Sequence, residues 1–197
     1  VDTPYHQDEY KWVMYSHPEI IPAGSVPHPP LTELIYTKLG PLVGDNNFRL
    51  IPLGFSTINL FLLFYLSKFL FGKKEAFIIT SLFAVSFYSI LASLMVDVDG
   101  AVMPFFALLL FIGYFKFKSS GWKDYKWLSL LIIGGLGGFL VKLSGILPFV
   151  ALAIDFAIEM KVFSDRKKIL KYILSGLGII TGLILILVLA RFIFPFF

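Results

Sequence analysis

Apolar stretches of about 20 residues recur along most of this chain and constrain its fold more than any other feature. A helix of about 20 apolar residues crosses the ~30 Å hydrocarbon core of a bilayer. Only 15% of the residues are charged, against roughly 25% in soluble domains. The sequence therefore predicts an all-α integral, multi-pass membrane protein. We expect spans at about residues 51–71, 76–96, 101–117, 127–142, 146–160 and 172–194.

Several classes of protein are excluded by composition. The net charge of +4 comes from basic residues in short loops between the spans, so it does not indicate a nucleic-acid partner. The chain has no cysteine, which excludes disulfides, thiol catalysis and zinc–thiolate sites. No phosphate-cradling loop, dinucleotide-binding fingerprint or Ser-His-Asp arrangement is visible. Chemistry, if present, must come from scattered ionisable residues near the membrane.

The first 49 residues are polar and rich in proline, and we interpret them as a loop outside the membrane. Their prolines exclude a long helix, although a short one over Glu9–Met14 is compatible with them. A second, amphipathic helix is expected at residues 31–39, directly after a proline, and we predict that it lies at the membrane interface. Gly40 and Pro41 are expected to end it.

The distribution of lysine and arginine predicts which side of the membrane this loop occupies. Five basic residues lie on its side of the predicted spans, and twelve lie in the alternate loops. The positive-inside rule assigns the side with twelve to the cytoplasm. Residues 1–49 are therefore predicted to be extracytoplasmic or lumenal, and residues 50–197 form the transmembrane domain. The twelve are Lys68, Lys73, Lys74, Lys116, Lys118, Lys123, Lys126, Lys161, Arg166, Lys167, Lys168 and Lys171.

Three ionisable residues lie close to the outer ends of the predicted spans. An ionisable group near membrane depth is costly and is by default a candidate functional residue. Lys142, near the end of the fourth span, is the sharpest case, and its alternative role is to extend its ammonium to the interface. Asp97 and Asp99 lie between the second and third spans, where a solvated turn is an equal alternative.

Four further candidates belong to the outer loop. Asp8 and Glu9 form an acidic pair, for which we favour a functional role over simple solvation. His28 stands before two prolines that hold it rigidly, so it is a candidate ligand or a turn residue. Arg49 directly precedes the first span and could bind a phosphate or a lipid head group.

These residues carry a resemblance to a known family. The order of the motifs, their sidedness and their spacing resemble the protein O-mannosyltransferases and the wider group of polyprenyl-phosphate-dependent glycosyltransferases, which includes the aminoarabinose transferases. The resemblance covers about residues 5–150. Its motifs are Asp8-Glu9, Val26-Pro27-His28-Pro29-Pro30-Leu31, Phe48-Arg49-Leu50-Ile51-Pro52, Asp97 or Asp99, and Val141-Lys142-Leu143-Ser144-Gly145.

The resemblance implies a GT-C-type transmembrane domain that transfers a sugar, with inversion, from a polyprenyl-phosphate donor to a hydroxyl of a protein or lipid. It implies Asp8 as the general base, with Glu9 positioning the acceptor or the base. Lys142 and Arg49 would bind the donor phosphate. The remaining candidates would orient the sugar or acceptor or help to hold a cation; they are Asp99, Asp97 and His28.

Two departures from the family bear on this interpretation. The lysine element reads Val-Lys-Leu-Ser-Gly, where the family has a Thr-Lys-Gly-like sequence, and a divalent metal is left open, with His28 and Asp8 as candidate ligands. The family also places a span before the Asp-Glu loop and further spans after the region matched here, so we expect this chain to be a fragment. The alternative function is a non-catalytic membrane subunit or a transporter fragment that binds lipid or a partner.

Overall fold

The structure is a computed structural model that describes residues 7–14 and 30–159, together with seven separate helical positions between residues 174 and 189. Within these residues all of the regular secondary structure is helical, which confirms the predicted all-α class. The predicted span at 172–194 lies outside the continuously described part of the chain.

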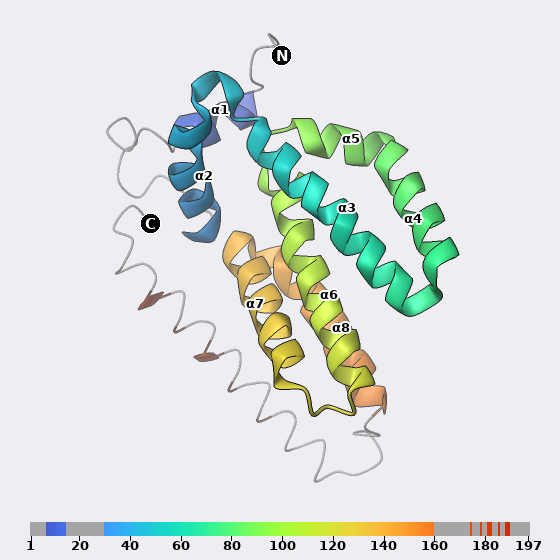
Figure 1. Ribbon diagram of the computed structural model, residues 1–197. Helices are drawn as coiled ribbons and strands as arrows, with labels where there is room; N and C mark the ends of the chain where they lie inside the picture. The colour runs from blue at the N-terminus through green and yellow to red at the C-terminus, as the bar shows by residue number, and fades with distance from the viewer. Residues whose placement is uncertain are drawn as a thin grey trace.

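Eight α-helices are present in the described residues (Figure 1). Three shorter helical turns connect some of them: the 3₁₀ turns η1 (Asp45–Asn47) and η3 (Leu143–Gly145), and the π-helical turn η2 (Val98–Val102). The α-helices are α1 (Gln7–Met14), α2 (Pro30–Val43), α3 (Leu50–Phe71), α4 (Lys73–Val85), α5 (Phe87–Leu94), α6 (Met103–Ser119), α7 (Tyr125–Val141) and α8 (Ile146–Glu159).

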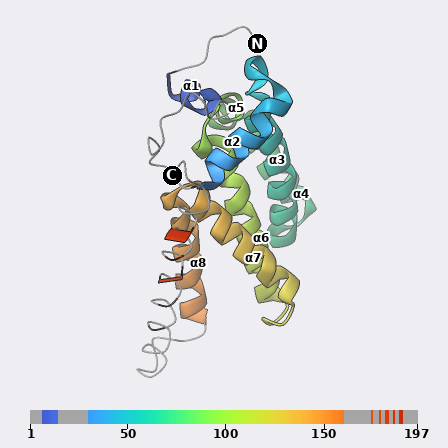
Figure 2. The same ribbon diagram turned by 90° about the vertical axis from the view of Figure 1, so that its left-hand side faces the viewer.

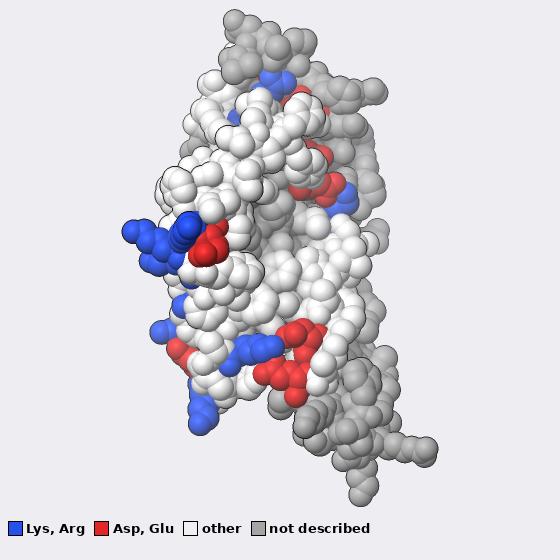
Figure 3. All heavy atoms as spheres, turned by 90° about the vertical axis from the view of Figure 1, so that its right-hand side faces the viewer, with Lys and Arg blue, Asp and Glu red and all other residues white. Residues whose placement is uncertain are grey.

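Two helical stretches in the described residues are long and apolar enough to cross a membrane, Asp45–Phe71 and Asp99–Ser119. Helices α4 and α5 together are also long and apolar enough, but they meet at an angle of 61°. They make a third candidate span if the bent pair is counted as one broken span. α7 is apolar but has only 17 residues, and α8 has 14. In Figure 3 the charged residues form a few separate groups, and uncharged residues cover the broad surface between these groups. This is expected for a helical membrane domain.

The predicted second span, residues 76–96, is not one helix. Ser86 has an extended backbone, with φ −67° and ψ 138°, and its side chain accepts a hydrogen bond from the Ser89 N–H. Serine is a favoured N-cap because its oxygen satisfies an amide at the start of a helix. The same hydroxyl donates to the carbonyl of Phe83 in the last turn of α4. One serine therefore ends α4 and starts α5.

The predicted interfacial helix is longer than residues 31–39. It begins at Pro30 and continues through Pro41 to Val43, so the expectation that Gly40-Pro41 ends it was wrong. A proline this close to the end of a helix removes only one late amide donor. The amide of Gly44, directly after the helix, still bonds to the carbonyl of Gly40. The longer helix adds a further turn over the end of the bundle.

Glycines bring α6 and α7 into backbone contact. A Cβ atom on Gly113 of α6 would lie 2.4 Å from the backbone nitrogen of Leu131, and one on Gly134 of α7 would lie 2.3 Å from that of Leu110. Neither position has room for a side chain. The glycine-rich sequence of α7 thus permits the close approach of helices that small residues allow in membranes.

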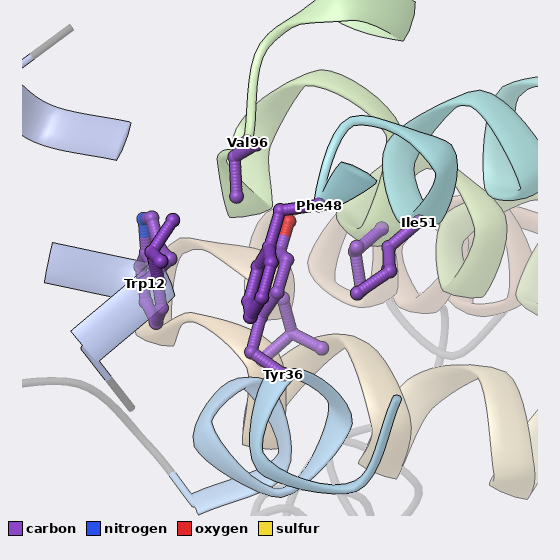
Figure 4. Packing of buried hydrophobic residues seen from close by; sticks show 8 residues of the cluster. Trp12, Tyr36, Phe48, Ile51 and Val96 are labelled. Carbon is purple, nitrogen blue, oxygen red and sulfur yellow. The ribbon is translucent and has the colours of Figure 1, made fainter. Parts of the chain in front are cut away.

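A hydrophobic cluster joins the segments at one end of the molecule. Figures 1 and 2 both place α1, α2 and α5 at this end, while α6, α7 and α8 extend away from it. In Figure 4, Trp12 of α1 and Tyr36 of α2 lie near Phe48, the residue before Arg49. Burying such side chains stabilises the fold by about 1.5–3 kcal/mol each. The cluster consists of Trp12, Val13, Tyr36, Phe48, Ile51, Val96, Val102 and Val141.

Candidate active site

An ion pair joins α1 to the start of α3. The Arg49 guanidinium donates to Glu9 twice, from Nη2 to Oε2 at 3.1 Å and from Nε to Oε1 at 3.4 Å. The residue before α3 is Arg49 itself, so the sequence position of the helix start fixes where the cation lies. Glu9 is only 3% exposed. Two parallel bonds between a guanidinium and a carboxylate hold the carboxylate in a defined orientation as well as position.

Glu9 also binds the break between α5 and η2. Its Oε1 accepts a hydrogen bond from the Val96 N–H at 2.9 Å, across 87 positions of sequence. Helix α5 ends at Leu94; the next residue, Met95, has an extended backbone, and the chain then passes into η2. A single carboxylate therefore fixes α1, the start of α3 and the segment that carries Asp97 and Asp99.

A second ion pair joins η2 to the end of α7. Lys142 Nζ lies 2.5 Å from Asp99 Oδ2, and the two side chains are 36% and 43% exposed, respectively. The backbone of Lys142 is extended, with φ −156° and ψ 142°, so α7 ends there and η3 begins at the next residue. These two candidate residues are therefore in direct contact, and both side chains are partly exposed.

Helix α2 holds the backbone on both sides of this second pair. Thr32 Oγ1 donates to the Val141 carbonyl at 2.8 Å, beside Lys142, and the Tyr36 hydroxyl donates to the Asp97 carbonyl at 3.1 Å. Both side chains are fully buried. Burial raises the pKa of Tyr36, and the charges of Asp97 and Glu9 raise it further, so the hydroxyl remains a donor at neutral pH.

The predicted site residues are brought together to different extents. Arg49 lies with Glu9, and Lys142 lies with Asp99, while Asp97 is half-buried in the segment between the two pairs. Asp8 lies in α1, but its side chain is outside the described part of the structure, as is the whole of His28. Their roles, including a shared cavity of Asp8, Asp99 and Lys142 and a metal site, stay predictions. The described residues contain no group of three metal-ligating side chains.

Sequence reasoning missed the part played by α2. The available signal was the spacing of Thr32, Tyr36 and Gly40, which repeats every four residues and places all three on one buried face. It also missed Glu33, whose Oε2 is buried and has no hydrogen-bond partner among the described residues. Burial raises the pKa of this carboxyl.

Comparison with protein families finds a match that runs across this site. Residues 27–191 match the family described as dolichyl-phosphate-mannose-protein mannosyltransferase. The chain belongs to this family. The resemblance drawn from the sequence is therefore confirmed, and membership indicates a membrane glycosyltransferase of the GT-C type, mannosyltransferase-like.

The matched segment includes one residue of the first ion pair and both residues of the second: Arg49, Asp99 and Lys142. Asp8 and Glu9 precede it, so the family match does not bear on them. Comparison with curated proteins gives no match, and neither does comparison with solved structures.

Proposed function

We propose that this mannosyltransferase-family protein transfers a sugar from a polyprenyl-phosphate donor to a hydroxyl of a protein or lipid, on the outer or lumenal face of the membrane. The observation that carries the proposal is the partly exposed Lys142–Asp99 pair. The segment that carries Asp99 is bonded, through the Val96 N–H and Glu9, to the α1 helix that bears Asp8. The donor, the acceptor and the roles below are parts of the proposal.

Lys142 is suited to the phosphate of the donor. An ammonium carries three N–H donors, and the bond to Asp99 uses one of them. When the bond between the sugar and the phosphate breaks, negative charge grows on the departing polyprenyl phosphate. A fixed cation stabilises that transition state more than it stabilises the bound donor, which is the condition for raising the rate.

Arg49 belongs to the same proposal, as a second cation for the phosphate. Its bonds to Glu9 hold its guanidinium in place at the start of α3. Arginine recognises phosphate oxygens through the same planar set of N–H groups that it presents to a carboxylate. Glu9, held between Arg49 and Val96, would then position α1 relative to the donor.

The chemistry assigned to Asp8 is general-base catalysis. The acceptor hydroxyl attacks the anomeric carbon on the face opposite the phosphate, and its proton passes to Asp8. A carbon–oxygen bond to the acceptor forms as the bond to phosphate breaks, so the configuration inverts and polyprenyl phosphate leaves. Asp99 and Asp97 would accept hydrogen bonds from the sugar or acceptor hydroxyls, with His28 as a further contact or as a metal ligand beside Asp8.

Transfer assays on the full-length enzyme separate these roles. Asp8→Asn keeps the shape of the side chain but cannot take a proton, so transfer should fall about 10²–10⁴-fold with donor binding nearly unchanged. Lys142→Met keeps the apolar stem and removes the charge, so both donor affinity and turnover should fall. Lys73 is an exposed cation at the start of α4, next to the end of α3 that lies away from Arg49. Lys73→Met is therefore the matched control and should leave both values unchanged.

The opposite outcomes are equally informative. Wild-type turnover by Asp8→Asn at saturating donor and acceptor would remove Asp8 as the base. If Lys142→Met also transferred sugar normally, the loop and its ion pairs would serve the alternative non-catalytic function, binding of lipid or a partner.

A further inference from the structure

A cavity of about 80 Å³ lies between α3, α5 and the start of α6, apart from the two ion pairs. It is in the half of the bundle nearest α1 and α2, because Asn59 comes within the first three turns of α3 and Gly100 belongs to η2. The residues around it are Ser56, Asn59, Phe83, Tyr88, Ser89, Ala92, Gly100 and Pro104.

Asn59 gives this cavity an unsatisfied hydrogen-bond acceptor. The residue is 2% exposed, and its Nδ2 donates to the Ala101 carbonyl at 2.8 Å. That bond fixes the orientation of the amide, and it leaves Oδ1 buried with no hydrogen-bond partner in the described structure. Buried polar atoms in folded proteins nearly always have partners, so a group that donates a hydrogen is expected here.

The other residues that line the cavity indicate that the bound group is uncharged. Three hydroxyl-bearing residues share the lining with Asn59, namely Ser56, Tyr88 and Ser89, and no acidic or basic side chain contributes to it. A phosphate or carboxylate has only acceptor oxygens at neutral pH, which would face the Asn59 oxygen unfavourably. A charged ligand would also lack a counter-charge in a low-dielectric site. The lining therefore selects an uncharged hydroxyl.

The size and the mouth of the cavity favour a hydroxyl carried on a carbon skeleton over water alone. One buried water needs about 10–15 Å³ and two to four polar partners, so the volume exceeds one water while the remaining walls are carbon, from Phe83, Ala92 and Pro104. Phe83 is 36% exposed and Tyr88 is 66% exposed, on a segment of the apolar α4–α5 element. A ligand would thus enter past aromatic rings from the lipid side.

We infer that this cavity binds the head group of an uncharged, hydroxyl-bearing membrane lipid, with one hydroxyl donating to Asn59 Oδ1 and the adjoining carbons packed between α3 and α5. The site uses none of the residues assigned to sugar transfer. It does not depend on the proposed reaction, and its test needs no enzymatic activity.

Lipid retention provides that test. The purified protein is placed in phosphatidylcholine nanodiscs that contain monoglucosyl diacylglycerol. Native mass spectrometry then counts the glycolipid molecules that stay bound when the protein is released from the nanodisc. Parallel samples contain equal fractions of the same glycolipid with every hydroxyl acetylated, or of phosphatidic acid. The free-hydroxyl glycolipid should be retained about tenfold more than either, since loss of one buried hydrogen bond has an effect of this order.

Variants locate the retained lipid. Asn59→Leu removes the acceptor itself and should reduce retention, but it also removes the bond to Ala101 and could destabilise the protein. Ser56→Leu fills the cavity from α3 and leaves the bond from Asn59 to Ala101 intact, so it should reduce retention roughly tenfold. Thr80→Val is the matched control, because the Thr80 hydroxyl is another buried group without a partner in the described residues but lies outside the cavity. It should retain lipid as the wild type does.

Three results would overturn the inference. The acetylated glycolipid or phosphatidic acid could be retained as well as the free-hydroxyl form. Ser56→Leu could retain as much glycolipid as the wild type does. A high-resolution density map of the glycolipid-containing sample could show ordered water alone beside Asn59.

Discussion

Removing Arg49 should destabilise the protein far more than removing the charge of its partner Glu9. In Arg49→Met the Glu9 carboxylate, with its side chain 4% exposed, loses the Arg49 guanidinium and keeps the bond to the Val96 N–H. Removing one partner of a buried ion pair typically costs about 3–5 kcal/mol. For a chain of this size that corresponds to a fall in Tm of roughly 6–20 °C.

Glu9→Gln should cost less because of the geometry of the pair. The amide oxygen of glutamine can still accept from Val96, and the Arg49 side chain is 19% exposed, so its charge reaches solvent when the carboxylate is gone. We expect a loss of about 1–2 kcal/mol, the value of hydrogen bonds to a charged group. The order of the two variants follows from which charge is the more deeply buried.

The measurement is a double-mutant cycle on unfolding of the purified protein, followed by heat and by denaturing detergent. The double variant has no buried carboxylate at position 9 facing the lost guanidinium, so it should be less destabilised than the sum of the single variants by about 1–3 kcal/mol. Lys38→Met, an exposed cation on α2, is the control and should change stability by no more than ~0.5 kcal/mol. An Arg49→Met variant as stable as Glu9→Gln, or a cycle with no coupling, would refute the reasoning.

Three other predictions concern different parts of the molecule. Gly134→Ala should destabilise by about 1–3 kcal/mol because its Cβ would meet the α6 backbone. Gly135→Ala should be neutral or slightly stabilising in thermal unfolding, because its Cβ would meet only side-chain atoms, of Phe149 at 3.4 Å and of Leu110 at 3.6 Å. Equal effects would contradict the packing argument. Burial raises the pKa of Glu33 above its ordinary 4.5, so folding disfavours the ionised form and stability should fall as pH rises from 4.5 through the raised value. Glu33→Gln should be more stable than wild type at neutral pH and lose that part of the pH dependence, and identical Tm profiles from acid to neutral pH would rule this out. Single cysteines at Ser25 and Ser119 should react with impermeant reagents from opposite sides of the membrane, and reaction of both from the same side would refute the predicted topology.

The sequence was informative where a property depends on composition or local spacing. Long apolar runs predicted a helical membrane domain because a buried backbone in lipid must satisfy its own hydrogen bonds. Pro30 indicated where α2 begins, and a short helix over Glu9–Met14 was compatible with the sequence, since both depend on neighbouring residues. The motifs around Arg49 and Lys142 indicated the family, which the match over residues 27–191 confirmed.

Local signals were insufficient where two influences compete at one residue. The pair Gly40-Pro41 does not end α2, which continues to Val43. The Gly44 N–H still bonds to the Gly40 carbonyl at the end of the helix. The single serine at position 86 looked unremarkable within an apolar run, yet its capping bonds divide the predicted second span. Each outcome depends on a hydrogen bond that the pattern of apolar residues does not encode.

By itself the sequence determined that the chain is helical and apolar, that its chemistry-bearing residues cluster near the ends of the apolar runs, and which family it resembles. Only the tertiary structure decided how those residues pair: Arg49 with Glu9, and Lys142 with Asp99. The physical reason is sequence distance. Contacts across 40 and 43 positions are set by how the helices pack, here by a shared hydrophobic cluster and by glycine contacts between α6 and α7, which no local stretch of sequence specifies alone.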